Sequence, residues 1–210
     1  MSKGCFISYK TEDKKEAKEI SLFLKNRGYN ITCLESWIEN DDSEAVLEII
    51  RKKYMSNSSV TLFLIGNDSY EDLSNNKEKL NSQYFIIREI QATLYNRKGN
   101  PRDGLIGIVL PKAESKVFPK GTGISQKGRI KGEIKIDDET VVREFSRNFW
   151  MSDKPNYGIK DDKRFAVLCR LVEFKRNPEF YIERAIKKAK NTTLNVQFTG
   201  IYHNYIPPLK

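Results

Sequence analysis

Short apolar runs alternate with amphipathic segments along the first half of the chain. The strand-like runs cover residues 5–9, 30–34, 59–66 and 105–110. The run over residues 59–66 is apolar on both of its sides, as in a central parallel strand that helices cover on both faces. In the segments between the runs, apolar residues recur every three or four positions, which is the period of a helix with one buried face.

The helical segments expected from this pattern cover residues 14–27, 43–50 and 82–96. Thr11 or Asp13 is expected to cap the first helix, and Gly28 to end it. A polar loop is expected over residues 67–81. Regular alternation of strands with helical crossovers predicts an α/β fold, an open and mostly parallel sheet with helices on both faces.

The second half of the chain has a weaker pattern. Glycines among lysines over residues 121–132 indicate a long loop or a hairpin. Residues 141–145 are expected to form a short strand or a short helix. Residues 165–175 are expected to be helical, and Asn177-Pro178 to begin a further helix as N-cap and first helical residue. The domain organisation expected from this pattern is an α/β core over 1–112, a basic loop or hairpin region over 113–160 that completes it, and a helical C-terminal extension and tail over 161–210.

The charge of the chain is unevenly distributed. The 210 residues carry a formal net charge of +9. Residues 1–110 contain 16 Lys and Arg and 16 Asp and Glu, whereas residues 111–210 contain the other 21 and 12. A basic half suggests a nucleic-acid or membrane-surface partner. No DNA- or RNA-binding motif accompanies the excess, so nucleic-acid binding is the less favoured hypothesis, and solvated lysines on a hairpin and a terminal helix explain the charge as well.

Several classes of protein are disfavoured by what the sequence lacks. No apolar run reaches the ~18–20 residues of a membrane span, and the first residues form no apolar signal-peptide core. Cys5, Cys33 and Cys169 are too far apart for a disulfide framework or a metal motif, and a reducing cytoplasm is the expected location. His203 is the only histidine. We therefore expect no metal, and any acid–base chemistry must use carboxylates, Lys, Tyr or Cys.

Candidate ligand-binding residues lie where strands end. Ligands of open parallel sheets bind beyond the carboxyl ends of the strands. The segments that follow the first two strands and the start of the third helix should therefore meet. In that helix, Phe85 and Glu89 are four residues apart and share one flank, which is expected to lie away from the core centre. The candidate side chains are Ser8, Tyr9, Lys10, Asp13, Trp37, Phe85 and Glu89.

These segments resemble TIR domains, and in particular the TIR-like subunit of the bacterial Thoeris antiphage system. The run Phe6-Ile-Ser-Tyr9 with Asp13 is similar to the opening of the family. The strand over 60–66, followed by the helix carrying Phe85-Ile-Ile-Arg-Glu89-Ile90, is similar to its apolar third strand and its "Trp-Val-x-x-Glu-Ile" helix. Trp37 and Glu39 are similar to a Trp followed by an acidic residue in the Thoeris subunit. The resemblance covers about residues 4–112.

The resemblance implies a flavodoxin-like sheet and an activity. Enzymes of the family cleave the bond between nicotinamide and ribose in NAD, as NAD glycohydrolases or ADP-ribosyl cyclases, with NAD as substrate and no cofactor. Their catalytic residue corresponds to Glu89. In Thoeris, the ADP-ribose-derived product, cyclic or conjugated, activates a separate effector in antiviral defence. The choice of product is open, because Phe85 replaces the usual Trp, Gln83 replaces a small hydroxyl residue, and the 67–81 loop is long.

The residues suit this chemistry without metal or histidine. Nicotinamide is a cationic leaving group and the transition state resembles an oxocarbenium ion, which a carboxylate stabilises. Tyr9, Trp37 and Phe85 can stack on flat or cationic rings, and Lys10 can contact the pyrophosphate. Other interpretations remain open: Glu89 as a solvated helix carboxylate, Trp37 as cover for the edge of the core and Asp13 as an acidic residue favoured by the helix dipole.

Two alternatives to an enzyme are also open. The first is a non-catalytic TIR-like module that assembles with itself or with another protein, in which Glu89 would be part of a salt bridge. The second is a nucleic-acid binder that uses residues 111–210. Self-association is compatible with all three hypotheses.

Overall fold

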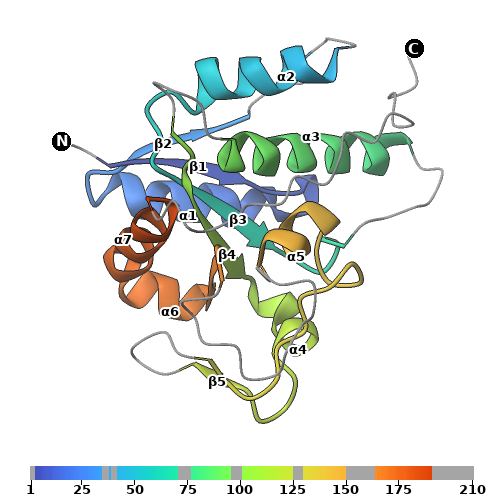
Figure 1. The fold of residues 1–210 in the computed structure, drawn as a ribbon. Coiled ribbons are helices and arrows are strands. Elements are labelled where there is room, and N and C mark those ends of the chain that lie inside the picture. The colour runs from blue at the N-terminus through green and yellow to red at the C-terminus, as the bar shows by residue number, and fades with distance from the viewer. Residues whose placement is uncertain are drawn as a thin grey trace.

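A computed structural model describes residues 3–34, 38, 42–70, 77–95, 101–124, 130–149 and 164–190. Its centre is a five-stranded parallel sheet in the order β2-β1-β3-β4-β7 (Figure 1). The strands are β1 (Gly4–Ser8), β2 (Asn30–Cys33), β3 (Val60–Ile65), β4 (Gly104–Val109) and β7 (Val167–Arg170). With β7 counted as the fifth strand, this is the flavodoxin-like order 2-1-3-4-5, and it confirms the expected α/β class.

Helices cover both faces of this sheet. On one face lie α1 (Lys14–Lys25), α6 (Leu171–Arg176) and α7 (Pro178–Ala189). On the other face lie α2 (Ser43–Ile49), α3 (Lys77–Leu94) and α5 (Arg143–Phe149), with α2 next to α3 (Figure 1). The chirality of parallel strand–helix–strand crossovers produces this two-sided arrangement.

Shorter elements connect the main ones. The η1 turn (Thr11–Asp13) precedes α1, and the π-helical turn η2 (Ile50–Tyr54) continues α2. The η3 turn (Pro111–Ala113) and α4 (Glu114–Val117) follow β4. The expected hairpin is present as the antiparallel pair β5 (Gly123–Ile124) and β6 (Ile130–Lys131).

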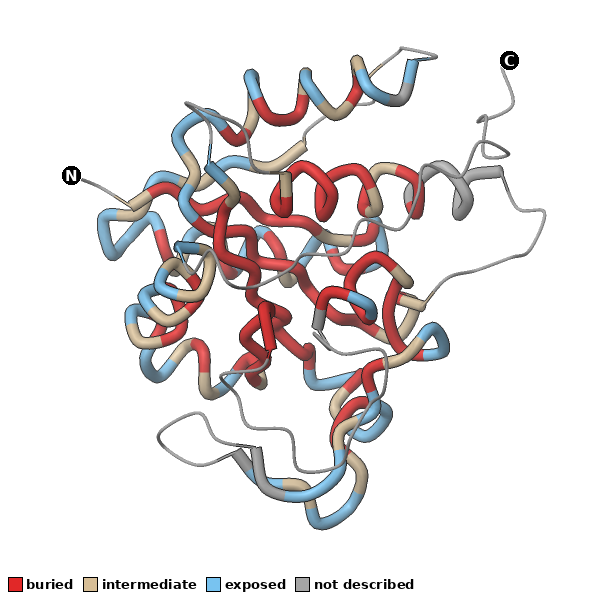
Figure 2. Tube along the Cα trace, viewed as in Figure 1, coloured by how far each residue is buried: buried red, intermediate tan, exposed pale blue. Residues whose placement is uncertain are grey.

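The core is divided between the two faces by the alternation of strand side chains. In β1, Cys5 and Ile7 pack towards α1, whereas Phe6 packs towards α2 and α3. Every residue of β3 and β4 is buried, as Figure 2 shows for the centre of the sheet. Because successive side chains of a strand point to opposite faces, Ser8 lies on the same face as Phe6 and therefore faces α3.

Two element predictions need correction. Residues 167–170 form a strand that pairs with β4, although residues 165–175 were expected to be helical. A short apolar run fits a buried strand as well as a buried helix, and pairing with β4 decides between them. Helix α3 begins at Lys77 rather than near Ser82, within the expected loop. Its first residues are Lys77-Glu-Lys-Leu80. Lys, Glu and Leu all have a high helix propensity, although three of the four residues are polar.

The expected helix ends are partly confirmed. Gly28 follows α1 with a φ of 81°, a conformation that glycine adopts readily. Asn177 caps α7 by accepting a hydrogen bond from the Phe180 N–H, with Pro178 as the first helical residue. Asp13, in contrast, makes no side-chain cap bond to α1. Its carboxylate takes part in a different interaction, described below.

Candidate active site

The side chains of Ser8 and Glu89 meet at the carboxyl end of β1. Ser8 is the last residue of this strand, and its Oγ lies 2.6 Å from Oε2 of Glu89 on α3. Both side chains are buried, Glu89 with an exposed fraction of only 4%. The expected position of Glu89 on a flank away from the core centre is therefore wrong, and so is the alternative of a solvated helix carboxylate: the residue is buried and faces the sheet. The strand order changes direction beside β1 and β3, so the pair lies where ligands of such sheets bind.

Burial changes the protonation of Glu89. Loss of solvent raises the pKa of its carboxyl from the usual range to about 8, and the hydrogen bond from Ser8 opposes part of this rise. At pH 7 the carboxyl is therefore mostly neutral in the unliganded protein. Among the described residues, no cation lies within ion-pair distance of Glu89. A buried carboxyl with a perturbed pKa at a strand end is a typical feature of functional sites.

Hydroxyl contacts hold the Glu89 turn of α3 against the sheet. The Thr93 hydroxyl donates to the Glu89 carbonyl oxygen at 2.8 Å and is hydrogen-bonded to the Thr61 hydroxyl on β3 at 2.7 Å. All three residues are buried. Because Ser8 and Thr61 lie on adjacent strands, the two contacts fix the helix along its length. Thr61 was not selected from the sequence, whereas the spacing of four between Glu89 and Thr93 indicates a shared helix face and a contact between the two residues.

The residues after Ser8 lead away from Glu89. Tyr9 is half-buried and packs against the core on the α1 face. Lys10 is buried, and its ammonium donates to the Tyr70 carbonyl oxygen at 3.1 Å and lies 5.6 Å from the centre of the Tyr70 ring. The structure thus places Lys10 against the loop after β3. Tyr70 was not selected from the sequence, because it is a lone aromatic residue in a polar loop.

Asp13 joins three segments at the same edge of the sheet. Its carboxylate forms a 2.7 Å ion pair with Lys112, which follows β4. A Cβ atom placed on Gly66, just after β3, would lie 2.2 Å from the same carboxylate. Burial raises the pKa of Asp13, whereas the Lys112 ammonium opposes this. The Asp13 carboxylate, just after β1, thus pairs with Lys112 after β4 and fills the space beside Gly66 after β3; we call this arrangement the Asp13 clamp.

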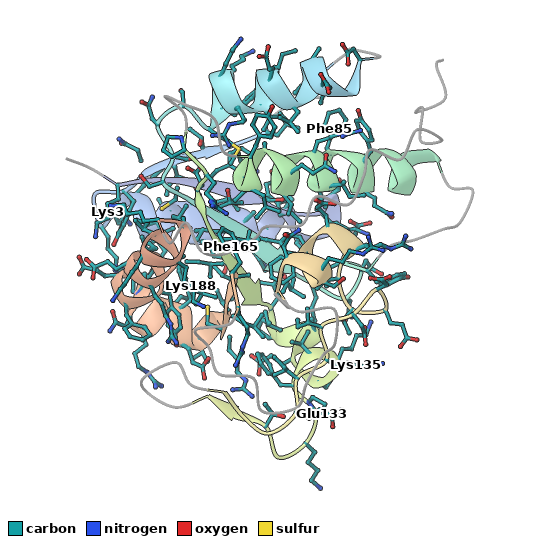
Figure 3. The ribbon with its side chains drawn as sticks, viewed as in Figure 1. Lys3, Phe85, Glu133, Lys135, Phe165 and Lys188 are labelled. Carbon is teal, nitrogen blue, oxygen red and sulfur yellow. The ribbon has the colours of Figure 1, made fainter. Side chains whose placement is uncertain are left out.

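Phe85 lies one turn before Glu89, and its ring packs among apolar side chains rather than at the Ser8–Glu89 contact. It is half-buried, packs towards Phe6 and α2, and meets the Tyr84 ring edge to face with 5.4 Å between centres. Figure 3 labels it between α2 and α3. The expected site residue Trp37 and its neighbour Glu39 lie outside the described residues.

The site can perform acid–base or electrostatic chemistry with one buried carboxyl and one hydroxyl. Across the described ranges, no His, Cys, Asp and Glu side chains gather in a group of three or more that would hold a metal ion. None of the described helices combines the length and apolar character needed to span a membrane. Comparisons of the sequence with protein-family models and with curated proteins find no match.

Proposed function

We propose that this protein is a TIR-like enzyme that cleaves the bond between nicotinamide and ribose in NAD, with Glu89 as its catalytic residue. The observation that carries the proposal is the buried Ser8–Glu89 pair, 2.6 Å between oxygens, at the carboxyl end of β1. The TIR-like motifs place a catalytic glutamate at this helix position. The contact supplies a reason for the Ser in Phe6-Ile-Ser-Tyr9, because its hydroxyl orients the carboxyl.

The chemistry needs one negative charge next to the ribose. As the glycosidic bond breaks, positive charge develops on the sugar ring, and an ionised Glu89 would stabilise it. Ser8 donates to that carboxylate and holds the carboxyl group in one orientation. Buried surroundings strengthen the attraction between the two charges compared with water.

The raised pKa of Glu89 suits a cationic substrate. In the unliganded protein a neutral carboxyl avoids the cost of a buried, unpaired charge. A nicotinamide cation that enters beside it favours the ionised form and lowers the pKa, since opposite charges stabilise each other. The carboxyl releases its proton to water as the substrate binds, so the carboxylate is present when the glycosidic bond breaks.

The wider role follows from the same resemblance. We propose that the product is derived from ADP-ribose, cyclic or conjugated, and that it activates a separate effector in antiphage defence, as NAD-consuming TIR-like subunits of the Thoeris system do. In this role the protein acts in the cytoplasm as an NAD glycohydrolase or ADP-ribosyl cyclase. NAD is the substrate, and no bound cofactor takes part.

Nicotinamide release from NAD tests the proposal. The purified native protein and the Glu89→Gln variant are incubated with NAD, and nicotinamide and the remaining products are followed by mass spectrometry. Gln keeps the shape and an acceptor oxygen for Ser8 but carries no charge, so we expect release to fall at least a hundredfold. The matched control is Glu48→Gln, on the exposed surface of α2, which should retain native activity. Equal release by the native protein and Glu89→Gln would refute the catalytic role of Glu89.

A further inference from the structure

A separate cleft lies on the side of the molecule where α4 follows β4. Its volume is about 680 Å³, within the range of pockets for small ligands. The loop after β3, the segment containing α4, and the residues that precede α5 form its walls. Figure 3 labels Lys135, one of its lining residues, beside α4. Glu89 is not among the residues that line it.

One wall carries a cation next to an aromatic ring. Lys116 is exposed, and its ammonium bonds the Asn67 carbonyl oxygen at 3.0 Å and lies 5.9 Å from the centre of the Tyr70 ring. Within the described parts of the chain, Lys116 forms no ion pair. The other lysine of the cleft, Lys135, is paired with Glu139 at 2.7 Å. Lys116 is therefore the cation that an anionic ligand would meet.

The residues that precede α5 contribute carboxylates to the lining of the cleft. Asp138 accepts hydrogen bonds from Arg143 Nε at 3.1 Å and from the Ser146 hydroxyl at 3.0 Å, and both donors lie on α5. These contacts hold the carboxylate in place and leave it further acceptor positions, since an ionised carboxylate has about four. Glu139 also lines the cleft. A ligand with hydroxyl groups can donate to this wall.

Hydrogen bonds anchor the residues between the end of β3 and Tyr70. The Ser69 hydroxyl accepts from the Gly66 N–H at 2.7 Å and lies 3.3 Å from the Leu64 carbonyl oxygen. Lys10 bonds the Tyr70 carbonyl oxygen from the other side. The aromatic wall is thus attached to the end of β3 and to the segment that follows Ser8, so little order is lost when a flat ring stacks on it.

We propose that this cleft binds a mononucleotide, with the base against Tyr70, the phosphate at Lys116 and the ribose hydroxyls towards Asp138 and Glu139. A mononucleotide would contact the aromatic ring, the ammonium group and the carboxylates of the cleft at the same time. Inorganic phosphate would use Lys116 alone, and a nucleoside would leave that cation without a partner. The site is distinct from the Ser8–Glu89 pair, and it does not depend on NAD being the substrate there.

Calorimetric titration of the full chain with AMP tests this site. We expect saturable binding that weakens with added salt, because a phosphate–ammonium contact contributes. Lys116→Ala and Tyr70→Ala should each weaken the binding at least fivefold. Lys120→Ala removes an exposed lysine that is close in sequence but does not line the cleft, and it should leave the affinity within twofold of native. Adenosine and inorganic phosphate should each bind at least tenfold more weakly than AMP.

Three results would overturn the proposal. These are no binding of AMP at millimolar concentration, equal affinity in the native, Lys116→Ala and Tyr70→Ala proteins, and loss of AMP binding in Glu89→Gln, which would place the nucleotide at the other site. Failure of NAD cleavage would leave all three measurements unaffected, so the two proposals can fail separately.

Discussion

At the scale of single residues, the protonation of Glu89 links its burial to its proposed activity. The ionised form is the one that stabilises a ribosyl cation, and in the free protein it becomes the major form only above a pKa of about 8. We therefore expect kcat/KM for NAD to rise about tenfold per pH unit below pH 8 and to level off above it, since this ratio reports the free enzyme. Initial rates of nicotinamide release between pH 6 and 9 measure the profile.

Removal of the Ser8 hydroxyl should move that profile. The hydrogen bond from Ser8 lowers the pKa of Glu89, so in Ser8→Ala the pKa rises further. The free energy of a hydrogen bond to a charged group corresponds to a pKa shift of roughly one unit. In Ser8→Ala, kcat/KM should therefore level off at a pH about one unit higher than in the native protein. A merely structural role of Ser8 would reduce the rate at every pH without moving the midpoint, and this result would contradict the assignment.

The same carboxyl makes stability depend on pH. Its folded pKa of about 8 lies above the value of 4.5 for a free glutamate, so between these values the folded state binds more protons than the unfolded state. The neutral carboxyl therefore makes its full contribution to the free energy of unfolding at low pH, and this contribution is lost as the pH rises towards 8. Glu89→Gln should therefore be more stable than native at pH 8, by a few kcal/mol, and close to native at pH 5.

Urea denaturation at the two pH values measures this difference. Glu48→Gln, on the exposed surface of α2, is the control and should show no pH-dependent gain. A Glu89→Gln variant that is less stable than native at pH 8 would show that the buried carboxyl is paired more strongly than its single contact with Ser8 indicates.

At the scale of elements, the Asp13 clamp requires a glycine at the end of β3. A Cβ at position 66 would lie 2.2 Å from the Asp13 carboxylate, which is buried and paired with Lys112. Gly66→Ala must displace this carboxylate, so we expect a loss of roughly 1–3 kcal/mol in the free energy of unfolding. Gly123→Ala is the control, because nothing lies within 4 Å of its added Cβ. Equal urea midpoints for the two variants would contradict the clamp.

Most of the elements followed from the hydrophobic pattern. The four strands of the first half have strong apolar runs, and their helices show a clear period, so their positions are close to those expected. β7 was missed because Val167-Leu-Cys-Arg170 is too short to show a period. The early start of α3 was missed because local polarity indicates exposure and says little about backbone conformation.

At the scale of the whole molecule, several cations of the basic second half form ion pairs. Arg170 lies 3.2 Å from Glu114 and 3.3 Å from Glu173, and Lys175 lies 3.9 Å from Glu19 on α1. Of these pairs, Lys175–Glu19 joins the second half of the chain to the first, although exposed pairs add little stability. The positive excess of residues 111–210 remains, because two of the three pairs use carboxylates of the same half.

Retention on double-stranded DNA tests the role of that charge. We expect weak retention at 20 mM salt and none at 150 mM, as for a surface with a net positive charge but without an organised groove. Strong retention at 150 mM salt would instead favour the nucleic-acid hypothesis for residues 111–210.

The sequence by itself determined the α/β class, the place of the first four strands and the choice of Glu89 as the candidate carboxyl, because hydrophobic period and motif order are local properties. Only the tertiary structure decided that Ser8 touches Glu89, that Asp13 clamps Gly66 and Lys112, and that Tyr70 and Lys116 share a cleft. Each of these contacts joins residues far apart in the chain, at the edge where parallel strands end. Their proximity depends on strand order and register, which come from the packing of the whole sheet.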